Sequence, residues 1–134
     1  MSVKAVLLTR DRLDDAALTR MVETPALGGV VTFLGVVRND TDGVATEALI
    51  YEAYEERALA EMRRICEAAV GRWDANVAAA HRLGKLMPGE VSVVTAAACA
   101  HRAEAFACCQ FLIDRIKADA PIWKKEALAE ESER

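Results

Sequence analysis

Apolar residues follow two different periods along this chain. Short runs rich in β-branched and small apolar residues predict strands at residues 3–9, 29–37, 45–54, 76–82 and 90–99. Apolar residues spaced every three or four positions predict amphipathic helices at residues 11–23, 55–72 and 102–117. The resulting order, β-α-β-β-α-β-β-α, is typical of an α+β fold in which helices pack on a mainly antiparallel sheet. It is close to a ferredoxin-like split β-α-β core with an extra N-terminal βα unit.

Polar and turn-forming residues mark the expected ends of the first elements. A turn cluster at residues 39–43 separates two strand runs, which predicts an antiparallel hairpin between residues 29–37 and 45–54. Asp11 or Asp14 is expected to cap the first helix, because a carboxylate there can accept hydrogen bonds from free backbone N–H groups.

The C-terminal half is expected to contain a loop, a buried strand and the last helix. Residues 83–89 contain a Pro-Gly turn and indicate a loop, whereas the small apolar run at 90–99 predicts a strand buried on both faces. Pro121 is expected to stop the last helix. That helix is expected to turn the following residues toward the core: Phe106, Cys109, Ile113 and Ile116.

Length and charge exclude several classes of function. The 134 residues suit one domain, 1–134, in which the acidic segment 127–134 is expected to be a mobile tail. With 17 lysines and arginines against 21 acidic residues, the net charge is −4, so a nucleic-acid partner is not expected. No apolar run approaches the roughly 18 residues of a membrane span, and the N-terminus lacks the pattern of a secretory signal. We expect no membrane association and a cytoplasmic location.

The cysteines and histidines do not form a metal motif. Four cysteines occur and none belongs to a C-x-x-C pair, while His81 and His101 lie far from any paired cysteine or carboxylate cluster. We therefore expect no metal site and no cofactor, with the cysteines serving as small core residues in a reducing compartment.

The candidate chemistry is cationic. Lys117 and Lys124 bracket the turn at Pro121, and a lysine held near other cations loses its proton more easily and can become a nucleophile or base. Arg38 ends a strand run, and the pair His101-Arg102 begins the last helix, where free backbone N–H groups favour anions. The alternative is that these side chains are solvated surface cations, with His101 acting only as a helix cap.

Six segments together resemble the catalytic (large) subunit of molybdopterin synthase. They are GVVTFLGVVRN (29–39), LIYEAY (49–54), HRLG (81–84), PGE (88–90), AHR (100–102) and KADAPIWKKE (117–126). Each segment alone is weak, but their order and spacing are specific, and the likeness runs from about residue 28 to residue 126. The resemblance implies an α/β hammerhead fold.

The resemblance also implies a reaction. Such an enzyme converts cyclic pyranopterin monophosphate to molybdopterin by adding the two sulfurs of its dithiolene. The sulfur arrives on the C-terminal Gly-Gly thiocarboxylate of a small ubiquitin-like partner subunit. The large subunit is expected to be a homodimer within a heterotetramer.

The family's site residues fall on matching positions of this sequence. Catalytic roles fall on Lys117 and Lys124, as general acid/base or covalent residue and as stabiliser of negative charge, without a decision between the two lysines. Substrate binding falls on Val36, Val37, Arg38, His101, Arg102, Lys117, Lys124, Lys125 and Glu126. Val36 stands where the family can carry a basic residue, and the C-terminal segment is shorter than in many members.

Two other hypotheses remain beside this one. A compact α+β domain with an anion pocket can be a non-enzymatic ligand-binding or oligomerisation module, which gives no reason for two lysines around the Pro121 turn. The chain can also be a structural subunit that has lost activity, since a fold does not guarantee a function.

Overall fold

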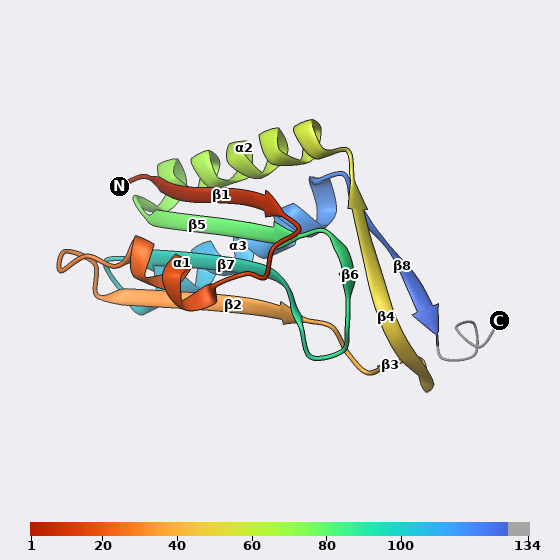
Figure 1. Cartoon of the computed structure of the whole chain (residues 1–134). Helices are drawn as coiled ribbons and strands as arrows, with labels where there is room; N and C mark the ends of the chain where they lie inside the picture. Colours follow the sequence, from red (N-terminus) through yellow and green to blue (C-terminus); the bar gives the residue numbers. More distant parts are fainter. Residues whose placement is uncertain (129–134) are drawn as a thin grey trace.

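The computed structural model describes residues 1–128 (Figure 1). Its elements are β1 (Val3–Thr9), α1 (Asp15–Val22), β2 (Gly29–Val36), β3 (Asp40–Thr41), β4 (Val44–Ala53), α2 (Glu55–Trp73), β5 (Asn76–Arg82), β6 (Gly84–Leu86), β7 (Val91–Cys99), α3 (Arg102–Asp119) and β8 (Ile122–Leu128). The predicted helices and strands are all present, and the α+β class is confirmed. Asp14 rather than Asp11 caps α1, and its Oδ1 accepts a hydrogen bond from the Ala17 amide.

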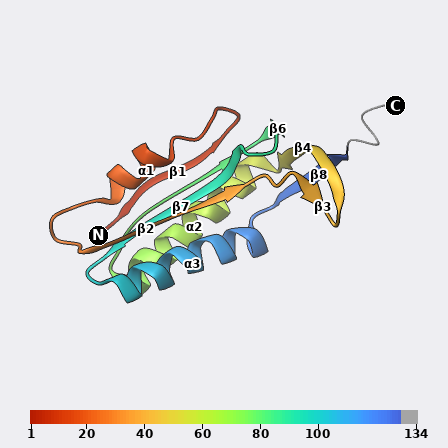
Figure 2. The same cartoon turned by 90° about the horizontal axis from the view of Figure 1, so that it is seen from below.

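The larger sheet has helices on both faces. Its strand order is β1-β5-β7-β2, with β1 parallel to β5 and the other pairs antiparallel. Helices α2 and α3 cover one face and α1 covers the other (Figure 2). Along β5, Val77 and Ala79 face the α2–α3 layer while Ala78 and Ala80 face α1. Strand β7 is likewise buried on both faces, which confirms the expectation for residues 90–99.

The second sheet contradicts the predicted hairpin between residues 29–37 and 45–54. Strand β4 pairs with β3, β6 and β8, whereas β2 pairs with β7 (Figure 1). The turn itself forms as expected, with positive φ at Asp42 and Gly43, but it joins β4 to the two-residue strand β3. Beyond Val36 the chain leaves the larger sheet, so β4 runs across the end of that sheet instead of along it.

Two further expectations for the C-terminal half are corrected. The loop predicted at residues 83–89 contains the short strand β6, because Gly84 has positive φ and turns the chain onto β4. Pro121 does end the helix, but the chain then continues as β8, so the proposed tail begins with residues paired to β4. The rest of that tail, residues 129–134, lies outside the described residues.

The buried stripe of α3 differs from the predicted one at a single position. Cys109, Ile113 and Ile116 are buried as expected, but Phe106 is 61% exposed. The stripe instead begins at Ala105, whose smaller side chain faces the α2–α3 layer of the core. The four cysteines are all buried, and burial raises the pKa of Cys66 and of Cys108 to about 12. The prediction that they are core residues is confirmed.

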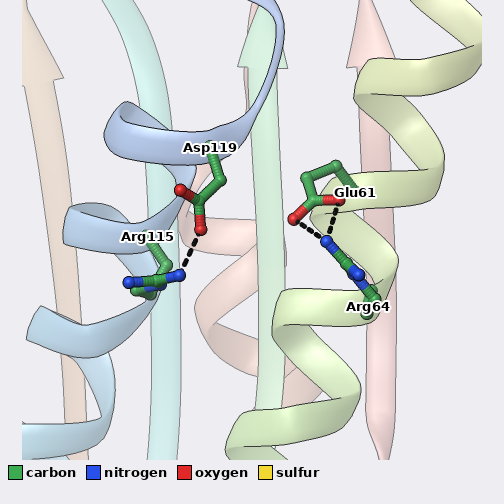
Figure 3. A network of polar contacts seen from close by, with 4 residues as sticks. All are labelled: Glu61, Arg64, Arg115 and Asp119. Atoms are coloured by element: carbon green, nitrogen blue, oxygen red, sulfur yellow. Dashed lines mark hydrogen bonds and ion pairs between the residues drawn. The ribbon is translucent and has the colours of Figure 1, made fainter.

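Ion pairs lie on the outer surface of the two long helices. Arg64 binds Glu61 within α2, and Arg115 binds Asp119 within α3, with the two pairs facing each other across the helix interface (Figure 3). The arginines are largely exposed, so these pairs contribute little to stability. The Asp119 carboxylate is thus paired with Arg115.

Strand β2 begins at a close backbone contact with the start of α3. A Cβ atom at Gly29 would lie 2.8 Å from the carbonyl carbon of His101 and 2.9 Å from the amide nitrogen of Arg102. Replacing Gly29 with alanine is therefore expected to lower the free energy of unfolding by about 1–3 kcal/mol, measured by urea denaturation. Gly71 in α2 is the matched control, because a Cβ there meets no atom within 4 Å. Equal stability of Gly29→Ala and wild type would contradict this reading of the contact.

Candidate active site

Three of the predicted cations line one cavity of about 260 Å³. Arg38 follows β2, Lys117 lies in the last turn of α3, and Lys124 lies on β8. The antiparallel pairing of β8 with β4 places Lys124 opposite Tyr51, which brings it beside the end of α3. The remaining lining residues are Gly35, Val36, Val37, Asp40, Thr46, Leu49, Tyr51, Ser92 and Glu126.

Of the three consecutive residues 124–126 that were predicted to bind substrate, alternation along the strand brings two to the cavity. Lys124 and Glu126 line the cavity, whereas Lys125 does not. The Nζ atom of Lys125 lies 3.0 Å from Oε1 of Glu52 on the neighbouring strand β4, and its side chain is 68% exposed. Successive side chains of a strand point to opposite faces, so Lys125 is not brought to the cavity with its neighbours.

A second cavity of about 140 Å³ adjoins the same two lysines. Tyr51, Lys117 and Lys124 line both cavities, so they form the boundary between them. The smaller cavity has mostly apolar walls, completed by His81, Val93, Ile116, Ile122 and Trp123. Trp123 lines this cavity and packs against Tyr54 with ring centroids 5.0 Å apart.

His81 is the buried titratable group of this region. The residue is 4% exposed, and its Nδ1 lies 2.8 Å from the backbone carbonyl oxygen of Arg82. A carbonyl only accepts, so Nδ1 carries the proton and Nε2 does not. Burial lowers the pKa of His81 to about 4, and the positive charge of Lys117 acts in the same direction. The imidazole is therefore neutral at neutral pH.

The lowered pKa of His81 makes stability depend on pH. The unfolded chain binds a proton near pH 6.5 and the folded chain only near pH 4, so stability is lost as the pH falls through this window. Between pH 7 and pH 5 we expect the His81 contribution to fall by about 2 kcal/mol, measured by urea denaturation. In His81→Gln this part of the pH dependence should disappear. An unchanged slope in that variant would assign the dependence to other groups.

The predicted pair His101-Arg102 does not join this site within one chain. His101 is the N-cap of α3 and Arg102 its first residue, whereas Lys117 lies in the last turn. At 1.5 Å per residue the two ends of this helix lie roughly 22 Å apart along its axis. Both side chains of the pair are exposed, and the side chain of His101 makes no capping hydrogen bond. Within one chain, this pair therefore lies apart from the cavity that Arg38, Lys117 and Lys124 line, and its part in substrate binding stays a prediction.

A long open groove connects the two ends of α3. It has a volume of about 880 Å³ and lies between β2, at residues 31–33, and α3, at residues 106–118. Lys117 lines its C-terminal end, so this lysine borders the groove as well as both cavities. Exposed apolar side chains of Phe33 and Phe106 lie along it, and β2 is an edge strand of the larger sheet.

Sequence reasoning missed the contributions of Tyr51 and His81. The edge-to-face contact of their rings, with centroids 4.9 Å apart, joins β4 to β5 beside the lysines. The HRLG segment was visible in the sequence, but nothing local showed that its histidine borders Lys117. The Nη1 of its neighbour Arg82 donates a hydrogen bond to Oε2 of Glu90 at 2.9 Å.

No metal centre emerges from the described part of the chain. Within residues 1–128, no three or more histidine, cysteine or acidic side chains are grouped so that they could bind a metal ion. In the same range, no helix has the length and apolar character needed to cross a membrane.

These features define a class of protein: an α+β protein in which two lysines and an arginine converge on one pocket. The family model described as "MoaE protein" matches residues 8–119. A molybdopterin synthase catalytic subunit from Thermoplasma volcanium is 40% identical over 124 residues, covering 92% of this chain and 90% of that protein. The corresponding Nostoc protein is 44% identical over 108 residues, covering 79% and 66%.

Solved structures agree with the sequence comparisons. Molybdopterin synthase from Staphylococcus aureus superposes with a TM-score of 0.87 at 32% identity, covering 90% of this chain and 89% of that one. A chain of a Helicobacter pylori complex between subunits 1 and 2 of molybdopterin-converting factor shares the fold at 22% identity, with a TM-score of 0.71 and coverage of 95% and 85%.

The chain belongs to the MoaE protein family. Its relatives are catalytic subunits of molybdopterin synthase, and the predictions of this family, of its fold and of an enzyme are confirmed. The alternative of a non-enzymatic module is not supported.

Proposed function

We propose that this chain converts cyclic pyranopterin monophosphate to molybdopterin, using sulfur from the C-terminal Gly-Gly thiocarboxylate of a small ubiquitin-like partner subunit. The observation that carries the proposal is the position of Lys117, which borders the groove and both cavities. A two-substrate transfer needs one reactive group that both substrates can reach, and Lys117 meets this requirement.

The larger cavity suits the pterin substrate. Arg38 supplies a planar guanidinium that can bind a phosphate through two hydrogen bonds. Asp40 and Glu126 on the same walls can accept hydrogen bonds from the N–H groups of a pterin ring. The pocket therefore offers partners for both ends of an anionic heterocycle.

The lysines are assigned to the chemistry. Lys117 acts as general acid/base or forms a transient covalent link with the partner's tail, and Lys124 stabilises developing negative charge. Both lysines lie at the boundary between the two cavities, so each can reach a group bound on either side.

A second copy of the chain completes the site in this proposal. His101 and Arg102 lie at the start of α3, one turn before the first groove-lining residue Phe106, and Lys117 lines the groove in the last turn of the helix. Two copies related by a two-fold axis through the middle of the groove would run their α3 helices antiparallel, which places each His101-Arg102 pair beside the other copy's Lys117. The exposed Phe33 and Phe106 would then be buried between the copies.

The proposed contact between two copies leads to a proposed quaternary structure. The homodimer would bind one small partner subunit at each site, giving a heterotetramer, and the Helicobacter pylori neighbour is itself a complex of two different subunits. We expect this assembly to act in the cytoplasm.

Product formation in a defined mixture tests the proposed function. The purified chain is incubated with cyclic pyranopterin monophosphate and a thiocarboxylated partner subunit, and the dithiolene product is detected by mass spectrometry. A partner bearing an ordinary C-terminal carboxylate is the control and should give no product. Absence of product with the thiocarboxylate would overturn the proposal and favour a structural subunit without activity.

A further inference from the structure

One ring nitrogen of His81 has no partner in this structure. Among residues 1–128, every fully buried side-chain nitrogen or oxygen has a hydrogen-bond partner. Nδ1 of His81 is engaged with the Arg82 carbonyl, but Nε2 makes no hydrogen bond with any described residue. Nε2 is therefore open to the space beside it, although the residue as a whole is only 4% exposed. That space is the smaller cavity, which His81 lines together with Lys117 and Lys124.

The free nitrogen is an acceptor. With the proton on Nδ1, Nε2 carries a lone pair and needs an N–H or O–H group opposite it. The walls of the cavity offer such groups on Tyr51, on Trp123 and on the two lysines. Tyr51 meets the imidazole edge to face through its ring, and of the remaining donors only the two lysines also line the larger cavity.

We propose that His81 is a positioning residue whose Nε2 accepts a hydrogen bond from the Lys117 ammonium and holds it at the boundary between the two cavities. Lys117 is chosen over Lys124 because it lines the groove as well as both cavities. Its positive charge also helps to lower the pKa of the imidazole. The catalytic consequence rests on the proposed function. The placement of Lys117 does not, so it can be tested without substrate.

Three features suit His81 to this role. The Arg82 carbonyl fixes the tautomer, so Nε2 is an acceptor rather than a donor. The Tyr51 ring, packed at 66° to the imidazole, fixes the orientation of the ring. Burial and the nearby lysine lower the pKa of His81 to about 4, so the ring does not become a second cation facing Lys117 at neutral pH.

Variants separate this role from a purely structural one. Glutamine can place its amide oxygen close to the position of Nε2, whereas asparagine reaches only the position of Nδ1, and leucine provides no acceptor. His81→Gln, His81→Asn and His81→Leu are compared with wild type. If the leucine variant does not fold, the comparison of Gln with Asn still tests the proposal. Both side chains are polar amides, and only Gln places an acceptor near the position of Nε2.

The first readout is the rate of reductive methylation of Lys117, measured by mass spectrometry relative to exposed Lys85 in the same sample. Removing the acceptor should free the Lys117 ammonium from its hydrogen bond, so its relative rate should rise at least about threefold in the Asn and Leu variants, as expected for loss of a hydrogen bond to a charged group. In the Gln variant the rate should stay within about twofold of wild type. Equal Lys117 rates in wild type, Asn and Leu variants would overturn the proposal.

The second readout is steady-state dithiolene formation. We expect kcat to fall about tenfold or more in the Asn and Leu variants, with KM for both substrates unchanged, and to be largely restored by Gln. A loss that Gln shares equally with Leu would overturn the positioning role. If wild type makes no product, the proposed function fails, while the methylation rates still decide where His81 holds Lys117.

Discussion

Replacing Lys117 with alanine is expected to lower the single-turnover rate of dithiolene formation by about a thousandfold or more. Lys117 is the side chain that borders the groove and both cavities, so its loss removes the reactive amine and leaves Lys124 without a partner at their boundary. Removing a nucleophile or a general acid/base typically has an effect of this size. The measurement is product formed from preassembled complex in a rapid-quench experiment, which separates chemistry from partner binding.

Neighbouring lysines provide the control for charge. Lys125→Ala removes the same charge from the adjacent position, but its ammonium binds Glu52 and lies outside the cavity. Its rate should stay within about threefold of wild type, because an exposed ion pair contributes little. Lys124→Ala should reduce the rate by about a hundredfold. An active Lys117→Ala variant, or equal losses in Lys124→Ala and Lys125→Ala, would contradict the assignment.

A mixed dimer carrying Lys117→Ala in one copy and Arg102→Ala in the other is expected to have about half the activity of the wild-type dimer, although each homodimeric variant is nearly inactive. Lys117 and Arg102 lie at opposite ends of α3, so a shared site draws them from different copies. One of the two sites in this mixed dimer retains both residues. The two chains are co-expressed with different affinity tags, and the mixed dimer is isolated by purification on both tags.

The reciprocal arrangement is the matched control. A dimer of wild type and the double variant Lys117→Ala/Arg102→Ala contains the same substitutions, but under the shared-site arrangement both of its sites are damaged. It should be nearly inactive. If each chain instead completed its own site, the activities of the two mixed dimers would be reversed. The two mixed dimers differ only in how the substitutions are distributed between the chains. Their activities therefore decide whether each site is shared between two copies or formed by one.

Local patterns predicted the elements well because their causes are local. The buried stripe of α3 follows from helical spacing, and the double burial of β7 follows from its small apolar residues. The pairing of strands is not local. The turn at Asp42 and Gly43 was correctly placed, but the preference of β2 for β7 depends on segments more than 50 residues apart. This is why the predicted β2–β4 hairpin is wrong.

The candidate site was likewise predicted only in part. The resemblance to the family placed Arg38, Lys117 and Lys124 in one set of site residues, and the fold brings these three to one cavity. The same likeness grouped His101-Arg102 with them without showing that a helix of 18 residues separates the two groups. Lys125 was included because it is adjacent in sequence, although strand alternation turns it toward Glu52.

Strand β8 also has a consequence for biosynthesis. The larger sheet and its helices are built from residues that precede Ile122, and both clusters of buried residues on its two faces are complete by Ala120. Lys124 arrives only with β8, which adds to β4 after the rest of that pairing surface has been synthesised. A polypeptide released before β8 would contain the buried residues of both clusters but would lack Lys124 at the pocket. The position of Lys124 therefore restricts the complete pocket to chains translated through β8.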